Sequence, residues 1–284
     1  MSVVKRIPWQ YRMAGWLARK RLQPFWQAVY RVALRGLGYN NFISAINGEG
    51  RFALAWARAH AMERVVIFDV GANEGDFTAA IQPLLPHARF HLFEPNPRTF
   101  GRLQERYGAA ANVTVEPRGI AAAAGALTLY DFRHGRGSER ASFLVESFTE
   151  ILQREAEPLP ARVVSLDAYA AERGIDFIDL LKIDTEGFEK QVLAGAARLV
   201  RESRIGAIQV EMNEHNVVSG FSLYALTKQL PDFDIYRIVA DGLMQMVSAA
   251  RPYAAGLDLA RYCNLVAVNR TPRKRDPCWP ALLS

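Results

Sequence analysis

The chain has 284 residues, 50% of them hydrophobic and 23% charged, so it can bury a complete core and has an ordinary globular composition. No apolar run approaches the roughly 18–20 residues needed to span a bilayer, and the residues that follow Lys5 and Arg6 do not form the core of a signal peptide. The two cysteines, Cys263 and Cys278, are too few for a disulfide framework and lack metal-ligand spacing. These features indicate a reducing, cytoplasmic location.

The net charge of +6 is concentrated near the N-terminus. Residues 1–60 contain ten Lys or Arg and a single acidic residue, Glu49, whereas the remainder contains 25 basic and 28 acidic residues. Because the body of the chain is slightly acidic, the composition argues against a nucleic-acid partner.

Residues 1–46 are predicted to form a basic, amphipathic helical extension. Pro24 suits the first turn of a helix, and Gly36 and Gly38 suit its end. Between them the apolar residues recur at helical spacing, and they are Trp26, Val29, Tyr30, Ala33, Leu34 and Leu37. One interpretation is a helical layer that packs on the domain with a solvated basic face. The other is a surface within residues 1–40 that meets an acidic substrate or anionic lipid, as a peripheral contact at the inner membrane.

From residue 65 onward, short apolar runs alternate with helical stretches. The predicted strands are 65–70, 90–93, 113–115, 127–132, 162–166, 180–183, 205–210, 235–239 and 265–268, and one predicted helix is 188–199. This alternation predicts a doubly wound α/β sheet. Asp241 and Gly242 lie between apolar runs and predict a hairpin, so we expect the end of the sheet to be antiparallel. We place the domain at 47–270 and a loose tail at 271–284.

The most informative segment follows the first predicted strand. Asp69 ends this strand, and the chain then turns through Gly71, Asn73 and Gly75 into a helix. Glycines allow a tight turn and a close approach of ligand to the main chain. Ligands of open α/β sheets bind outside the carboxyl ends of the strands, where this loop must lie.

A second acid strengthens this interpretation. Glu94 ends the next strand, 25 positions after Asp69, where a carboxylate can accept hydrogen bonds from both ribose hydroxyls. An acid at the start of the loop would repel a pyrophosphate but could accept from the ammonium of a methionine moiety. The loop therefore favours a zwitterionic nucleoside cofactor over NAD.

The sequence resembles the FkbM family of S-adenosylmethionine-dependent methyltransferases. The matching segments are FDVGANEGDFT (68–78), FEPNP (93–97), LLKIDTEGFEKQVLAGA (180–196) and IQVEMNE (208–214). The resemblance implies a Rossmann-like class I methyltransferase fold, with a seven-stranded, mostly parallel sheet and an antiparallel last strand. It also implies methylation of a hydroxyl, often on a sugar of a glycan, a surface polysaccharide or a glycosylated natural product.

The resemblance extends to cofactor-binding residues. It assigns Asp69, Gly71, Asn73 and Gly75 to the cofactor loop and Glu94 to the ribose, with Asn96 in the same segment. Gly119 and Ile120 stand where such enzymes line the adenine pocket, although the alanines at 121–124 replace the polar residues expected there.

Candidate catalytic residues follow two of the predicted strands, 180–183 and 205–210. Asp184 and Glu211 are expected to orient or deprotonate the acceptor, and His215 is the alternative base. Purely structural roles are the alternative to catalysis, because Asp184 could cap the following helix and Glu186 could complement its dipole. The acids could also bind Mg²⁺, which the sequence leaves undecided. The polar stretch 133–140 is either a substrate loop or a plain surface loop.

Two other functions compete with this prediction. A nicotinamide-dependent oxidoreductase could use the same architecture, but the chain lacks a third loop glycine and a Tyr-x-x-x-Lys pair. An RNA methyltransferase needs a basic face beside Glu211, where the local sequence EMNEH is acidic.

Overall fold

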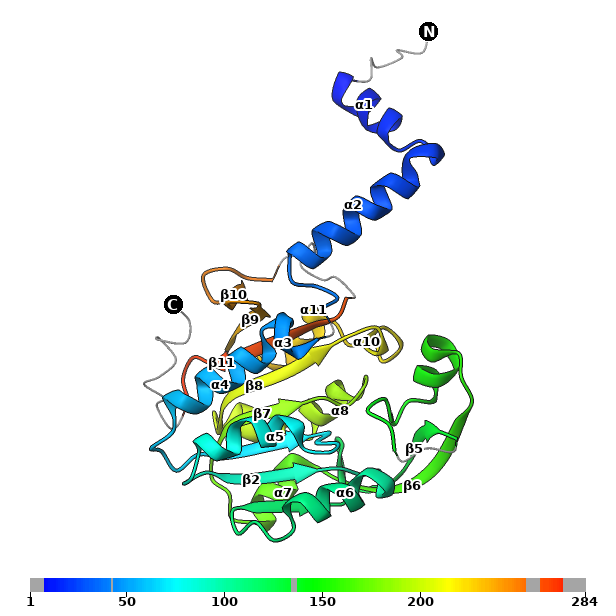
Figure 1. Cartoon of the computed structure of the whole chain (residues 1–284). Helices are drawn as coiled ribbons and strands as arrows, with labels where there is room; N and C mark the ends of the chain where they lie inside the picture. Colours follow the sequence, from blue (N-terminus) through cyan, green and yellow to red (C-terminus); the bar gives the residue numbers. More distant parts are fainter. Residues whose placement is uncertain (1–7, 42, 134–136, 254–260, 273–284) are drawn as a thin grey trace.

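The computed structural model describes residues 8–41, 43–133, 137–253 and 261–272 (Figure 1). Cys278 and most of the predicted tail lie outside these ranges. No helix within them is both long enough and apolar enough to cross a membrane.

An eight-stranded sheet forms the centre of the domain, in the order β10-β9-β11-β8-β7-β1-β2-β3. Strands β3, β2, β1, β7 and β8 pair in parallel, whereas β11 is antiparallel to both of its neighbours, β8 and β9. The strands are β1 (Val66–Val70), β2 (Arg89–Phe93), β3 (Val113–Glu116), β7 (Ile178–Ile183), β8 (Ile205–Met212), β9 (Phe233–Val239), β10 (Gly242–Val247) and β11 (Cys263–Asn269). The predicted doubly wound sheet with an antiparallel last strand is confirmed.

The sheet has one strand more than predicted. The hairpin expected at Asp241 and Gly242 is present, and it pairs β10 with β9 on the outer edge. Because β10 alternates exposed and partly buried residues over its first half, its sequence lacks the continuous apolar run of the central strands.

Helices cover both faces of the sheet, so the core has two layers (Figure 1). Successive side chains of a strand point to opposite faces, and Ile67 accordingly joins one core cluster while Phe68 joins the other. The first layer is formed by α4 (Glu49–Ala59), α5 (Asp76–Ile81), η2 (Gln82–Leu84) and α6 (Pro97–Tyr107), with α3 (Ser44–Asn47) leading into α4. The second contains α7 (Leu166–Glu172), α8 (Glu189–Ala194), α9 (Ala197–Arg201) and α11 (Leu223–Gln229), and α10 (His215–Val218) follows β8.

The helix predicted at 188–199 is interrupted between α8 and α9. The Gly195 carbonyl accepts a hydrogen bond from the Asp167 amide at 2.9 Å, and a Cβ at Gly195 would lie 2.2 Å from the carbonyl oxygen of Ala121. The Asp167 carboxylate then accepts from the amides of Arg198 and Leu199, at 2.8 and 2.9 Å, and so caps α9. Tertiary contacts therefore break a sequence with continuous helical periodicity.

A second, three-stranded sheet stands beside the domain. It has the order β4-β6-β5, with β4 (Gly119–Ile120), β5 (Gly125–Phe132) and β6 (Ala156–Val164), and a π-helical turn η3 (Ser147–Leu152) lies between β5 and β6. The strand predicted at 162–166 extends too far, because the Ser165 hydroxyl caps α7 by accepting from the Ala168 amide at 3.2 Å.

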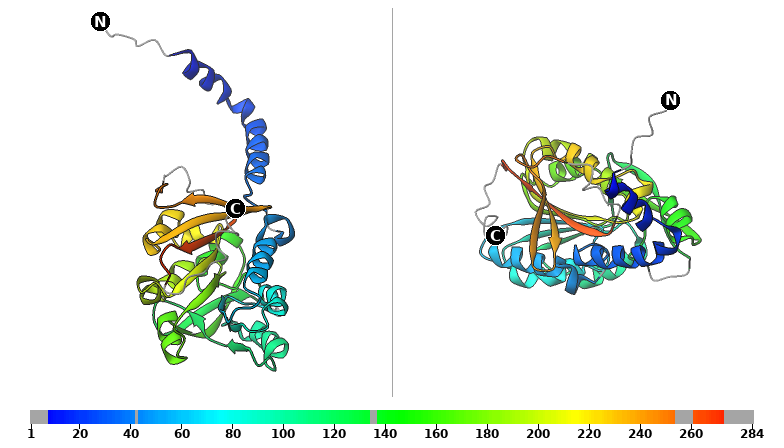
Figure 2. Two further views of the ribbon diagram at one scale, coloured as in Figure 1. Left: turned by 90° about the vertical axis from the view of Figure 1, so that its left-hand side faces the viewer. Right: turned by 90° about the horizontal axis from the view of Figure 1, so that it is seen from above.

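The N-terminal helices α1 (Trp9–Leu17), η1 (Lys20–Leu22) and α2 (Gln23–Gly36) project from the domain as an arm (Figures 1 and 2). In the described part of the arm, Leu34 is the only buried side chain of these helices. The predicted helical extension is therefore present, but the expectation that it packs on the domain as a layer is wrong for α1 and α2.

One glycine fixes the junction between α3 and α4. Gly48 has a φ of +90°, and a Cβ there would lie 2.0 Å from the carbonyl oxygen of Val239 on β9. We expect Gly48→Ala to lower the free energy of unfolding by about 2 kcal/mol or more, because strain and overpacking add. Gly101→Ala is the matched control, since its Cβ would meet nothing within 4 Å in helix α6 and should stabilise by about 0.5–1 kcal/mol. Urea unfolding measures both, and equal effects of the two substitutions would contradict this account.

Candidate functional site

The loop after β1 is shaped by contacts with the protein itself. Gly71 has a φ of +79°, and its Cβ would lie 1.8 Å from the carbonyl oxygen of Asp184. Gly75 also has a φ of +79°, and its Cβ would lie 2.5 Å from the Tyr107 ring. Both glycines are therefore required by close packing, which complements the ligand-based reason expected from the sequence. Gly71 and Asn73 line the cavity at the end of β1.

Glu94 lies in this cavity with Gly119 and Ile120, the residues that the sequence analysis assigned to the ribose and to the adenine pocket. Its two carboxylate oxygens each accept a backbone amide, from Asn73 and from Asn96, both at 2.8 Å. Burial raises the pKa of Glu94 to about 7, against the opposing effect of these two hydrogen bonds. Each oxygen has a second lone pair, so the carboxylate can still accept from a ligand hydroxyl.

Two predicted cofactor residues lie behind the cavity wall. The Asn96 side chain is fully buried, caps α6 by accepting from the Arg98 amide at 3.1 Å, and donates to Asp131 at 2.8 Å. This structural role replaces the cofactor contact that we expected of Asn96. Asp69 is also fully buried, and its Oδ2 accepts from the Thr78 hydroxyl at 3.0 Å. Its Oδ1 has no hydrogen-bond partner among the described residues.

A buried lysine joins the acids at the ends of β1 and β7. The parallel register places Lys182 beside Asp69, and its ammonium lies 4.0 Å from Asp69 Oδ1 and 2.9 Å from Asp184 Oδ2. Burial alone would lower the pKa of Lys182, but the carboxylates of Asp184, Asp69 and Glu49 raise it to a net value above the usual range. The ammonium therefore stays charged and anchors Asp184.

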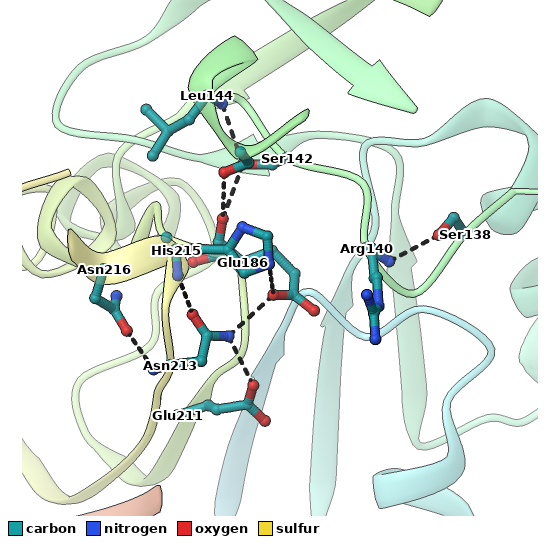
Figure 3. A network of polar contacts seen from close by, with 12 residues as sticks. Ser138, Arg140, Ser142, Leu144, Glu186, Glu211, Asn213, His215 and Asn216 are labelled. Carbon is teal, nitrogen blue, oxygen red and sulfur yellow. Dashed lines mark hydrogen bonds and ion pairs between the residues drawn. The ribbon is translucent and has the colours of Figure 1, made fainter. Parts of the chain in front are cut away.

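The ends of β7 and β8 bring the predicted catalytic acids together. Ile183 pairs with Val210, so Asp184 and Glu211 leave neighbouring strands at the same edge. The Asn213 amide donates to Glu211 Oε1 at 2.9 Å and to Glu186 Oε2 at 3.0 Å, and so bridges these two carboxyl groups (Figure 3). Burial and the neighbouring acids raise the pKa of Glu186 to about 8 and that of Glu211 well above its usual range. The bridged pair therefore holds a proton near neutral pH.

His215 lies in the same network and is buried (Figure 3). Its Nε2 is 3.4 Å from Glu186 Oε2. Burial lowers the pKa of His215, and the charge of Arg140 adds to this effect against that of Glu214. The ring is therefore neutral at physiological pH.

Glu189 holds the loop between β7 and α8 in place. Its carboxylate accepts from the amide and hydroxyl of Thr185, at 3.0 and 2.9 Å, and from the Gly187 amide at 3.2 Å. The loop backbone is strained, because Glu186 has a φ of +51°. Glu189 therefore fixes the loop that carries Glu186, and Glu186 lies before α8 rather than in its first turn.

Two hollows meet at this loop. The first, with Glu94, is flanked by apolar side chains that include Phe93, Ile120, Leu129 and Phe143. The second is a polar cleft that contains Glu211 and His215. The residues that line both are Gly71, Asn73, Glu139, Asp184 and Glu186. Asp184 and Glu186 thus lie where a molecule bound in one hollow would meet a molecule bound in the other.

The sequence analysis did not identify several residues of the cleft. Lys182, Glu186, Asn213, Glu49 and Tyr262 line it, and Arg140 enters it from the polar stretch 133–140, of which 134–136 lie outside the described residues. The sequence feature that could have identified Lys182 as a site residue is its position as a charged residue within an apolar strand. Among the described residues, no group of three or more His, Cys, Asp or Glu side chains is arranged to hold a metal ion.

The FkbM methyltransferase domain family matches residues 69–233, which is more than half of the chain. The chain belongs to this family. The stretch matched contains every predicted cofactor and catalytic residue, from Asp69 to His215.

Two curated methyltransferases are similar to this FkbM-family chain. The 2-O-methyltransferase NoeI of Sinorhizobium fredii is 26% identical over 60% of this chain and 72% of its own length. The 31-O-demethyl-FK506 methyltransferase FkbM of Streptomyces tacrolimicus is 32% identical over 46% of this chain, which spans 58% of that relative. The plantazolicin methyltransferase BpumL with SAH is a solved structure with a TM-score of 0.41 and 10% identity, over 90% of this chain and 93% of that one.

Membership of the FkbM family confirms the prediction of an S-adenosylmethionine-dependent O-methyltransferase with a Rossmann-like class I fold, and it sets aside the nicotinamide-dependent alternative. The residues present fit this cofactor. The carboxylates of Glu94 and Asp184 line the cavity as acceptors, and a cationic, hydroxyl-bearing nucleoside needs acceptors.

The raised pKa of Glu186 makes stability depend on pH. The folded chain binds this proton up to about pH 8, whereas the unfolded chain releases it near 4.5, so stability falls as the pH rises between these values. Glu186→Gln mimics the protonated form, and its advantage over the wild type in urea unfolding should therefore grow from pH 5 to pH 8. Glu146→Gln, at an exposed glutamate, is the control. Parallel curves for the wild type and Glu186→Gln would contradict a raised pKa.

Proposed function

We propose that this FkbM-family enzyme methylates a hydroxyl group of a neutral or amino-bearing sugar. The observation that carries the proposal is the hydrogen-bonded group of Glu186, Asn213 and Glu211, with Asp184 on the same cleft wall, at the meeting point of the two hollows. Carboxylates and amides recognise sugar hydroxyls through hydrogen bonds, and the wall of the same cleft includes the aromatic residue Tyr262.

The acceptor hydroxyl must lose its proton as it attacks. S-adenosylmethionine, when bound, supplies the methyl group as an electrophile. Asp184 is tied to Lys182 at 2.9 Å, so its role is to orient the hydroxyl. The bridged pair of Glu186 and Glu211 has raised pKa values, and such a carboxylate is a stronger base than a free one. We assign the role of the base that takes the acceptor's proton to Glu211. Both acids accept from Asn213, but Glu186 also contacts His215 and so is the acid that keeps the proton held by the pair.

His215 remains the alternative base. Its neutral ring has a nitrogen, Nδ1, without a hydrogen-bond partner among the described residues. It contacts Glu186 through Nε2, so it can also relay a proton within the network.

Substitution of the two acids tests these roles. Asp184→Asn and Glu211→Gln should each keep calorimetric binding of S-adenosylhomocysteine and lose turnover, by about 10²–10⁴-fold for Glu211→Gln, the range for loss of a general base. Glu105→Gln, on the exposed side of α6, is the control and should retain turnover. Unchanged turnover in Glu211→Gln would exclude this residue as the required base and transfer the role to His215.

The negative charge of the cleft limits which acceptor molecules can bind there. Eight carboxyl groups line its described part, from Glu49, Glu74, Asp76, Glu139, Asp184, Glu186, Glu211 and Glu214, against two basic groups, from Lys182 and Arg140. Even with protons on Glu186 and Glu211, acids outnumber bases. Like charges at short range in a partly buried site repel, so an anionic acceptor is disfavoured.

A panel of acceptors tests the limit. Neutral and amino-sugar oligosaccharides should be methylated with kcat/KM values at least about tenfold above those of a uronic-acid oligosaccharide of equal length, because one repulsive contact costs on the order of 1.4 kcal/mol or more. Transfer is measured with radiolabelled S-adenosylmethionine. Preference for the uronic acid would contradict the proposed acceptor class, whereas no transfer to any sugar would point to a hydroxyl of another natural product.

A further inference from the structure

The N-terminal arm, residues 8–37, projects from the domain (Figure 2). Large apolar side chains of the arm are exposed. The exposed fraction reaches 72% for Trp9 and Val32, 58% for Phe25 and 48% for Trp16. Isolated exposed apolar residues are ordinary, but a contiguous group of this size marks an interaction surface.

Each helix of the arm has a stripe of apolar residues along one side, and Tyr11, Phe25 and Val32 are exposed outside these stripes. In α1, Trp9, Met13 and Trp16 recur at helical spacing. In α2 the apolar stripe is Trp26, Val29, Tyr30 and Ala33, with Leu22 before the helix and Leu37 after it, while Arg31 and Arg35 lie on the opposite side. Aromatic residues on one face and basic residues on the other are typical of a helix that lies in a membrane interface.

Hydrogen bonds hold the bend between the two helices. The Trp26 indole donates to the Leu17 carbonyl at 2.9 Å, and the Gln23 amide donates to the Ala18 carbonyl at 3.1 Å. Arg19, Lys20 and Arg21 are exposed at this bend. The bend is therefore held in a defined conformation, and it exposes three consecutive basic residues.

The arm has charge of one sign only. Residues 1–48 contain eight Lys or Arg and no Asp or Glu. Two such arms would repel each other, which disfavours a second copy of the arm as the covering partner. A surface that accepts both the aromatic stripe and the basic residues must be apolar beneath an anionic layer, as an anionic bilayer is.

We propose that the arm docks the enzyme on an anionic membrane surface, with its aromatic stripe in the headgroup region and its basic residues against lipid phosphates. The root of the arm lies beside the acceptor cleft. The Asn40 amide donates to the Tyr262 carbonyl at 2.9 Å, and Tyr262 lines that cleft. Docking through the arm would thus bring the cleft close to the bilayer.

Vesicle sedimentation of the full chain tests the proposal without any measurement of methyl transfer. The chain should bind phosphatidylcholine vesicles that contain phosphatidylglycerol far more tightly than phosphatidylcholine alone, and added salt should release it. The triple substitution Arg19→Gln, Lys20→Gln, Arg21→Gln should weaken this binding by about 10²-fold. The matched control replaces three exposed arginines of the domain, Arg58→Gln, Arg89→Gln, Arg201→Gln, and should bind as the wild type does.

A second pair of variants tests the apolar contact. Trp9→Ala with Trp16→Ala should reduce vesicle binding at high salt, and brominated lipids should quench the fluorescence of the wild-type arm. Equal binding by the two charge triples, or no binding to anionic vesicles, would overturn the proposal. A change in oligomeric state caused by the arm substitutions, seen by gel filtration without vesicle binding, would instead identify a second copy as the partner.

Discussion

The acidic floor of the cleft depends on the buried ammonium of Lys182. A charge removed from water is costly unless it is paired, and here it lies 2.9 Å from Asp184 and 4.0 Å from Asp69. The parallel register of β1 with β7 makes this arrangement unavoidable, because Lys182 pairs directly with Asp69. Without this ammonium, the carboxyl groups of the cleft would repel one another. They would then have to bind protons or turn toward solvent.

That balance explains why one part of the network can hold a proton while another stays ionised. Asp184 is bound to the ammonium, whereas Glu186 and Glu211 are bridged by a neutral amide and are surrounded by further acids. Environment therefore separates chemically similar carboxyl groups into an orienting anion and a proton-binding pair, as paired acids in active sites commonly are separated. The strained backbone at Glu186 is kept in place by Glu189, so the division of roles is a property of the folded loop.

The sequence predicted what depends on local pattern, and it missed what depends on tertiary contact. The strand β1, its acid and its glycine loop follow from an apolar run and turn chemistry, and their positions are confirmed. The hydrogen-bond partners of the site's side chains could not be predicted from such local patterns. Asn96 and Asn213 are chemically identical residues beside strand ends, yet one caps α6 and the other bridges two acids. The cap of Asn96 is local, because it accepts from Arg98, two residues on. Its donation to Asp131 and the bridge from Asn213 to Glu186 depend on neighbours distant in sequence.

The distribution of charge connects the arm with the cleft. Basic residues are collected in a segment without acids, and the carboxyl groups are collected around the meeting point of the two hollows. A basic arm and an acidic cleft attract each other, so the arm could fold onto the cleft and block it if its direction were not fixed. The hydrogen bonds at the bend fix α1 relative to α2. The base of the arm is held by the Asn40 amide, which donates to the Tyr262 carbonyl at 2.9 Å, and by Tyr39, whose ring centre lies 4.0 Å from the Arg237 guanidinium. The arm's direction away from the domain is thus set by local packing, which leaves both charged surfaces free to meet different partners.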